Sequence, residues 1–317
     1  MFAIKLLRRL AVAALTLFLL MGYIFIATEI LPGDALDLTM TADEMAAMPP
    51  DALAQKKHEL GLDRPAIERF AGFVLHVARL DFGRTLITRA PVADIVWMPF
   101  RNSLLLAAAT LMVAIPLALF VGCVAALFHN RWPDHLISVA VIFGYSVPEF
   151  VIGTVLVLLF AVTWPLFPAT VTANTNDPAL KLLAAAPLPV ATVVIGSVAY
   201  LARVLRAGMI EALSSDFVER LRLMGIPEYR IVLRHALPAA VGPALTASAL
   251  YAAALVSGIV VVELVFAYPG IGQQMVRAVS TREIPIIQAI AILSALAVVA
   301  TNLAADLALY LLDPRRR

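Results

Sequence analysis

The sequence predicts an all-helical integral membrane protein, and two observations lead to that fold class. Of the 317 residues, 62% are hydrophobic and only 15% are charged. Soluble domains are about half apolar and about a quarter charged, so water is not the main solvent of this chain. The apolar residues also gather in long runs, whereas strands of a membrane barrel would alternate.

Six runs have about the 20 residues that a helix needs to cross a bilayer. They are about Leu10–Leu31, Ser103–Phe128, Leu136–Trp164, Leu188–Leu205, Ala239–Ala267 and Ile286–Leu312. Backbone amides in lipid must bond within their own segment, which favours helices over open strands. The first run follows basic residues as a signal peptide does. It exceeds the usual signal core of 7–15 residues, so we expect a retained span.

Several function classes are excluded by composition. A formal net charge of +2 is too small to suggest nucleic acid as a partner, and the single cysteine, Cys123, excludes an intramolecular disulfide. The histidines are scattered without an H-E-x-x-H pair, so we expect no metal site. The chain has no G-x-x-x-x-G-K-[ST] loop, so it does not cradle nucleotide phosphates itself.

Basic residues predict the orientation of the spans. With the N-terminus inside, most of them fall on the cytoplasmic side, whereas the two short outer loops hold only Lys181, Arg277 and Arg282. The cytoplasmic set is Lys5, Arg8, Arg9, Arg131, Arg203, Arg206, Arg220, Arg222, Arg230, Arg234 and Arg315 to Arg317. The first outer segment is also basic, but long segments translocate largely regardless of charge. We therefore expect both termini in the cytoplasm.

The outer segment, residues 32–102, reads as a small helical insert. Met48-Pro49-Pro50 predicts a break in the chain, and Leu53–Leu60 predicts a short helix that ends at Gly61. Asp63 can cap a further helix. One face of that helix is apolar, at Ile67, Phe70, Phe73, Val74 and Val77. This face suits packing on the membrane or on the chain's own spans, with contact to an external partner as the alternative.

The loop between the fourth and fifth spans carries well-formed helix signals. Asp216 can act as N-cap with Glu219 three residues later, the capping-box spacing. Phe217, Leu221 and Met224 then share one face, and Gly225 provides a left-handed stop. A second helix opens at Pro227 and Glu228 and ends before Pro238.

Helices this short must pack against something. One alternative is packing against the chain's own spans. The other is a protruding knob that enters a groove of a partner, with its apolar face seated and its charges at the rim.

This loop resembles that of the permease subunits of ABC importers of the dipeptide, oligopeptide and nickel class. Such permeases carry Glu-Ala-Ala, three residues, Gly, nine residues and then Ile-x-Leu-Pro. Glu219, Gly225, Leu237 and Pro238 fall at that spacing, and His235-Ala236-Leu237 is similar to the peptide branch. Arg220 and Leu221 depart from the small residues that are usual after the glutamate, which should alter the fine contacts of the loop.

The resemblance extends over nearly the whole chain. The matching motifs are Pro32-Gly33-Asp34, Leu60-Gly61-Leu62-Asp63-Arg64-Pro65, Asp81-Phe82-Gly83, the set Ser146, Pro148, Phe150 and Gly153, the set Glu263, Phe266 and Pro269-Gly270-Ile271-Gly272, and the tail Asn302, Asp306, Tyr310 and Asp313-Pro314-Arg315. Leu105 departs, because the family often has Glu there.

The resemblance implies a type I ABC importer permease fold in a bacterial inner membrane. It divides the chain into residues 1–31 with the first span, a periplasmic insert at 32–102, and a five-span core at 103–317 with an ATPase-docking loop at about 208–238. The implied partners are a second homologous permease, two ATP-binding cassette subunits that hold ATP and magnesium, and an external solute-binding protein. The chain itself would be no enzyme and bind no cofactor.

Ionisable residues within spans are costly and suggest function. Glu149, beside Pro148, either faces the solute pathway or makes a structural hydrogen bond, and we expect Glu263 to brace the turn at Tyr268. Asp306 suits pairing with Asn302 one turn earlier. We expect Arg203 and Arg206 either to contact lipid phosphates or to anchor the loop.

Two rival functions lack their signatures. A secondary carrier usually shows related halves, and we find no repeat. An intramembrane protease needs a Gly-x-Ser-x-Gly elbow or a histidine pair, and neither is present. The solute stays open among dipeptides, oligopeptides, nickel chelates, glutathione and opines.

Overall fold

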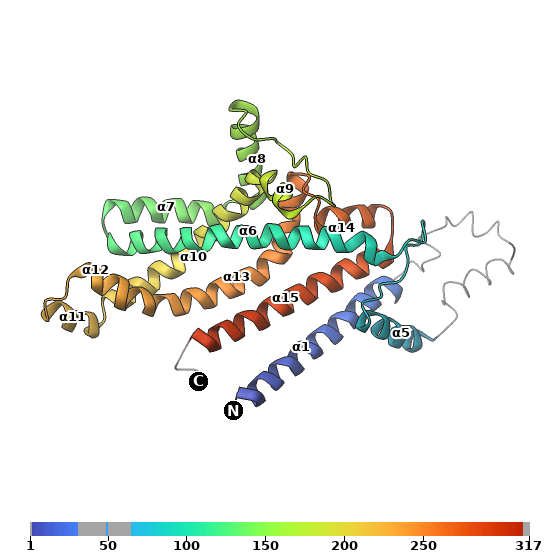
Figure 1. Ribbon diagram of the computed structural model, residues 1–317, viewed down its shortest axis with the longest axis horizontal. Coiled ribbons are helices and arrows are strands. Elements are labelled where there is room, and N and C mark those ends of the chain that lie inside the picture. Colours follow the sequence, from blue (N-terminus) through green and yellow to red (C-terminus); the bar gives the residue numbers. More distant parts are fainter. Residues whose placement is uncertain (1, 31–48, 50–64, 313–317) are drawn as a thin grey trace. The chain divides into compact units, whose positions relative to one another are not determined.

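The computed structural model describes residues 2–30, 49 and 65–312, which are predominantly helical. In the order of Figure 1 the elements are α1 (Phe2–Phe25), η1 (Ile26–Ile30), α5 (Ala66–Ala78), α6 (Val92–Leu127), α7 (Trp132–Ser146), α8 (Glu149–Val157), η2 (Leu158–Thr163), α9 (Ala179–Ala184), α10 (Pro187–Leu213), α11 (Asp216–Leu223), α12 (Glu228–Ile231), η3 (Val232–Ala236), α13 (Leu237–Val265), α14 (Ile271–Ser280) and α15 (Ile284–Leu312). The η segments are π-helices.

Five of the described helical segments are long and apolar enough to cross a membrane. They lie at 7–28, 92–127, 187–213, 228–255 and 284–307, and α7 with α8 and η2 makes a sixth if that bent pair is one span. The prediction of an all-helical fold with membrane-spanning helices is therefore confirmed for five segments, or six with the bent pair. The orientation of the termini stays a prediction.

The third predicted span, Leu136–Trp164, is broken beside Pro148. The chain bends by 103° between α7 and the segment from Glu149 to Thr163. Val147 adopts an extended conformation, with φ −86° and ψ 127°, because the ring of Pro148 disfavours the helical region for the residue before it. The bend places Glu149 in the first turn of α8.

Two other predicted spans are too short. α6 begins at Val92 rather than Ser103, and α10 runs to Leu213 rather than Leu205. The polar residues at which both predicted spans end lie inside the helices. Asn102, for example, is buried and donates to two backbone carbonyl oxygens, those of Thr175 and Pro269, at 3.0 and 2.9 Å.

The chain forms two compact units. Unit 1 contains residues 1–101 and 270–297, and unit 2 contains residues 102–269 and 298–317. The predicted division into residues 1–31, 32–102 and 103–317 concerns placement across a membrane and stays a prediction.

In unit 1, α5 packs on α1 through aromatic rings. The ring of Phe70 lies 5.6 Å from that of Phe18 and 5.4 Å from that of Phe25. The predicted apolar face therefore packs on the chain's own first helix, except at Ile67, which is exposed. The predictions for residues 32–34, 48, 50, 53–64 and 313–315 lie outside the described residues.

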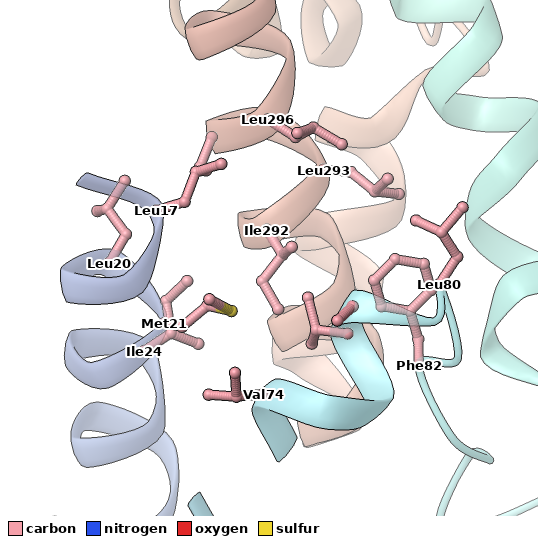
Figure 2. A pocket seen from close by; sticks show the side chains of 13 residues that line it. Leu17, Leu20, Met21, Ile24, Val74, Leu80, Phe82, Ile292, Leu293 and Leu296 are labelled. Carbon is pink, nitrogen blue, oxygen red and sulfur yellow. The ribbon is translucent and has the colours of Figure 1, made fainter. Parts of the chain in front are cut away.

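Unit 1 also contains an apolar crevice among α1, α5 and α15 (Figure 2). Its volume is about 300 Å³, and its lining includes Leu17 and Met21 of α1, Val74 of α5 and Leu293 of α15. The lining residues are apolar, so the crevice does not suit a hydrophilic solute.

In unit 2, α10 contacts both α7 and α13. Gly122 allows α6 to approach α10 closely, because a Cβ at that position would stand 2.8 Å from the carbonyl oxygen of Ala202. α11 and α12 lie at one end of the unit, beyond the ends of α7 and α10 (Figure 1). Residues 215–231, which comprise α11, its following turn and α12, are called the knob below.

Candidate functional site

The knob is a helical hairpin with a glycine stop. Gly225 has φ +76°, the left-handed region that glycine enters without strain. The amide of Ile226 donates to the carbonyl of Leu221 at 3.2 Å, and that of Gly225 to the carbonyl of Arg222 at 2.9 Å. These two bonds form a Schellman motif. The predicted stop at Gly225 is confirmed.

The predicted capping box at Asp216 and Glu219 is wrong. Ser215 occupies the N-cap, and Asp216 is the first residue of α11. The hydroxyl of Ser215 donates to the carbonyl of Ala212 at 2.7 Å instead of capping the helix, and Glu219 is exposed. Both carboxylates stay in the first turn, where negative charge suits the positive end of the helix dipole.

The knob has its own small core. Val218, Leu221 and Ile231 are buried against one another, and Ile226 packs on them. The predicted face of Phe217, Leu221 and Met224 is therefore wrong: Leu221 points inward, whereas Phe217 and Met224 are exposed. Since Leu221 is 6% exposed, this departure from the family pattern fills the core of the knob rather than its surface.

The outer surface of the knob is apolar with a charged edge. Phe217, Leu223 and Met224 are 56%, 82% and 67% exposed. Beside them Arg222 donates to the two carboxylate oxygens of Glu228, at 2.6 and 3.1 Å, and this carboxylate raises the pKa of the Arg222 guanidinium. Arg220 is also exposed. Exposed apolar side chains rimmed by charge are typical of a protein-binding surface.

The second helix of the hairpin does not end before Pro238. α12 passes through the π-helical η3 directly into α13, whose first turn contains Leu237 and Pro238. Proline lacks an N–H, and the wider π-helical turn before it accommodates the missing bond. His235 lies in η3, and its ring stands edge-on to Phe217 with centroids 5.7 Å apart.

An ion pair that the sequence did not predict fixes the turn before α7. Arg206 donates to the two carboxylate oxygens of Asp134, at 2.6 and 2.7 Å, and Asp134 is buried. The amide of Asn130, which has φ +60°, donates to the same carboxylate at 3.0 Å. Arg206 is predicted to contact lipid phosphates or to anchor the docking loop. It binds Asp134 instead. An acidic residue beside Pro133 signals a helix start, but not a partner 72 positions away.

Away from the knob, a group of hydrogen bonds around Glu263 holds the turn after α13 against α6. Glu263 is fully buried, and its carboxylate accepts a hydrogen bond from the hydroxyl of Ser103. Its backbone carbonyl accepts the amide of Tyr268 at 2.8 Å, and the Tyr268 hydroxyl donates to the carbonyl of Asn102 at 2.7 Å. The arrangement suits a bracing role for Glu263.

The remaining predicted acids have different surroundings. Glu149 is half-buried in the first turn of α8, and Asp306 is half-buried in α15. Among the described residues, no group of three or more His, Cys, Asp and Glu side chains is placed to hold a metal ion.

Comparison with known proteins identifies the family. Residues 114–317 match the family described as "Binding-protein-dependent transport system inner membrane component". A putative peptide transport system permease protein of Brucella abortus is 30% identical over 311 residues, which cover 98% of each chain. The glutathione transport system permease protein GsiC of Escherichia coli K12 is 32% identical over 302 residues, which cover 95% of each chain. The chain therefore belongs to the family of binding-protein-dependent transport system inner membrane components, and it is a permease of the ABC transport class.

Proposed function

We propose that this inner-membrane permease imports short peptides or glutathione, driven by ATP that separate subunits hydrolyse. The observation that carries the proposal is the knob, a hairpin with a buried core of its own and an exposed apolar surface at the end of unit 2. Its own core holds α11 on α12, so the hairpin can move as one body. Exposed Phe217, Leu223 and Met224 would otherwise face water.

The route of coupling follows from chain continuity. α10 leads into the knob, and α12 continues through η3 into α13. A displacement of the knob by an ATPase is therefore applied directly to two long helices that contact one another. This is rigid-body switching of a helical assembly between two states. One ATP-binding cassette subunit would bind the knob of this chain, and a second would bind the corresponding knob of a second permease.

The orientation of the chain agrees with that route. The knob carries Arg220, Arg222 and Arg230, and the positive-inside pattern assigns such segments to the cytoplasm. The ATPases then act on the cytoplasmic side, with both termini, and an external binding protein delivers the solute on the other side. The nature of the solute follows the named relatives, whose systems transport peptides and glutathione.

Reconstitution in proteoliposomes tests this function. The permease pair, its ATPases and the binding protein are assembled, and uptake of radiolabelled glutathione and trialanine is measured with ATP and with an ionophore. We expect uptake that requires ATP, that the ionophore leaves intact and that Gly225→Asp abolishes. Uptake driven by an ion gradient without the ATPases would establish a secondary carrier and contradict the proposal.

A further inference from the structure

Three tyrosine rings from three helices are stacked in unit 2. Tyr145 of α7 lies over Tyr200 of α10, with centroids 6.2 Å apart and an interplanar angle of 26°. Tyr200 in turn stacks on Tyr251 of α13, at 5.5 Å and 21°. Tyr145 is exposed, and the other two are partly exposed. These three residues are called the tyrosine ladder.

Opposite charges stand at the two ends of the ladder. The guanidinium carbon of Arg203 lies 4.9 Å from the ring centroid of Tyr145. At the other end, a Cβ built on Gly196 would stand 3.4 Å from a carboxylate oxygen of Glu149 and 3.9 Å from the hydroxyl of Tyr251. Gly196 and Arg203 are seven residues apart on α10, which places these two backbone positions about 10 Å apart along the helix.

Among the described residues, neither end charge has an ion-pair partner of opposite charge. Within the part of the chain that the structure describes, Glu149 and Arg203 form no ion pair, and the Glu149 carboxylate accepts no hydrogen bond. Arg206, three residues after Arg203, is by contrast paired with a buried carboxylate. Unneutralised charge within membrane-spanning segments is costly, and it marks a solute pathway more readily than a structural contact.

We infer that the tyrosine ladder, with Glu149 and Arg203 at its ends, is a surface of the translocation pathway that contacts a short zwitterionic peptide. The inference rests on the proposed function and names the chemistry of the solute. Glu149 receives the α-ammonium group, and Arg203 receives the carboxylate through charge-assisted hydrogen bonds. The rise of about 10 Å between Gly196 and Arg203 is comparable to the length of a short peptide at about 3.5 Å per residue.

The tyrosine rings explain how such a surface accepts varied sequences. Aromatic faces attract cations and cover apolar groups without requiring one particular side chain. Every unmodified short peptide has two charged ends, whatever its side chains. The ladder likewise has one charged residue at each end. The Arg203 end lies nearer the knob along α10, so the carboxylate of the solute would point toward the ATPase side.

The test uses the reconstituted complex with trialanine and glutathione as probes and measures two rates, probe uptake and ATP hydrolysis. Glu149→Gln and Arg203→Met should each lower uptake about tenfold, the effect of losing one charge-assisted contact, while ATP hydrolysis is retained. Tyr200→Leu removes the central ring of the ladder and should also lower uptake while ATP hydrolysis is retained. Tyr200→Phe keeps the stacked ring and should restore uptake. Matched controls at exposed positions, Glu68→Gln, Arg131→Met and Tyr23→Leu, should leave both rates unchanged.

The outcomes separate the inference from the proposed function. Uptake at the wild-type rate in the ladder variants would overturn the inference, and so would a parallel loss of uptake and ATP hydrolysis, which indicates a structural role. If the wild-type complex takes up neither probe in an ATP-dependent manner, the proposed function itself has failed.

Discussion

Two arginine–carboxylate pairs in unit 2 share a shortest contact of 2.6 Å and differ in their surroundings. Asp134 is 2% exposed where Arg206 binds it, whereas the side chains of Arg222 and Glu228 on the knob are about half exposed. An exposed pair contributes little because water screens it, but a buried carboxylate that loses its partner is strongly destabilising. Burial rather than distance therefore separates the pair that holds the helices from the pair at the rim of the knob.

The largest effect is expected at the buried pair. Arg206→Met leaves the Asp134 carboxylate buried without its cation, which should cost about 3–5 kcal/mol of stability. Thermal unfolding in mild detergent measures this loss. The matched control is Arg131→Met, since Arg131 is exposed beside the same turn and should tolerate the change.

A double variant sharpens the interpretation. Asp134→Asn combined with Arg206→Met removes both charges, so it should be less destabilising than the sum of the single changes, which a double-mutant cycle quantifies. Additive effects, or a wild-type melting temperature for Arg206→Met, would refute the assigned importance of this pair.

The core of the knob comes next. Ile231→Ala removes a fully buried side chain and should cost about 2–5 kcal/mol locally. Because the knob core is a cluster of its own, we expect faster amide hydrogen exchange across residues 216–231 with little change elsewhere in unit 2. Leu233→Ala, at an exposed position of η3, is the control. Equal exchange in both variants would contradict a separate core.

The smallest effect is expected at the exposed pair. Arg222→Gln should change stability by about 0–1 kcal/mol, and less at high salt, because the pair is solvated. A loss comparable to that of Arg206→Met would show that the comparison between the two pairs is wrong. The measurement is again thermal unfolding in detergent, at low and high ionic strength.

Local signals predicted the elements of this fold better than its contacts. Long apolar runs gave the membrane helices, and the glycine at position 225 gave the left-handed turn, because both depend on a few neighbouring residues. The bend at Pro148 was visible as a proline but not as a turn of 103°, since that angle depends on packing. The Asp134–Arg206 pair and the tyrosine ladder join residues far apart in the chain, which a single sequence does not reveal.

The incorrect predictions of which knob side chains face inward have a common cause. Phe217 and Val218 are adjacent apolar residues, and helical spacing alone allows either to face inward. The core formed by Val218 with Ile231 decides the choice, and Ile231 belongs to the next helix. The same tertiary contact explains why Leu221, expected at the partner surface, is buried.

We propose that the exposed face of the knob binds the ATPase. Leu223 and Leu180 are both 82% exposed, but only Leu223 lies on the knob. Co-purification of the ATPase subunits with the permease compares Leu223→Asp with Leu180→Asp. We predict that Leu223→Asp loses the ATPases, whereas Leu180→Asp retains them at the wild-type level. Retention of the ATPases by Leu223→Asp would contradict the claim.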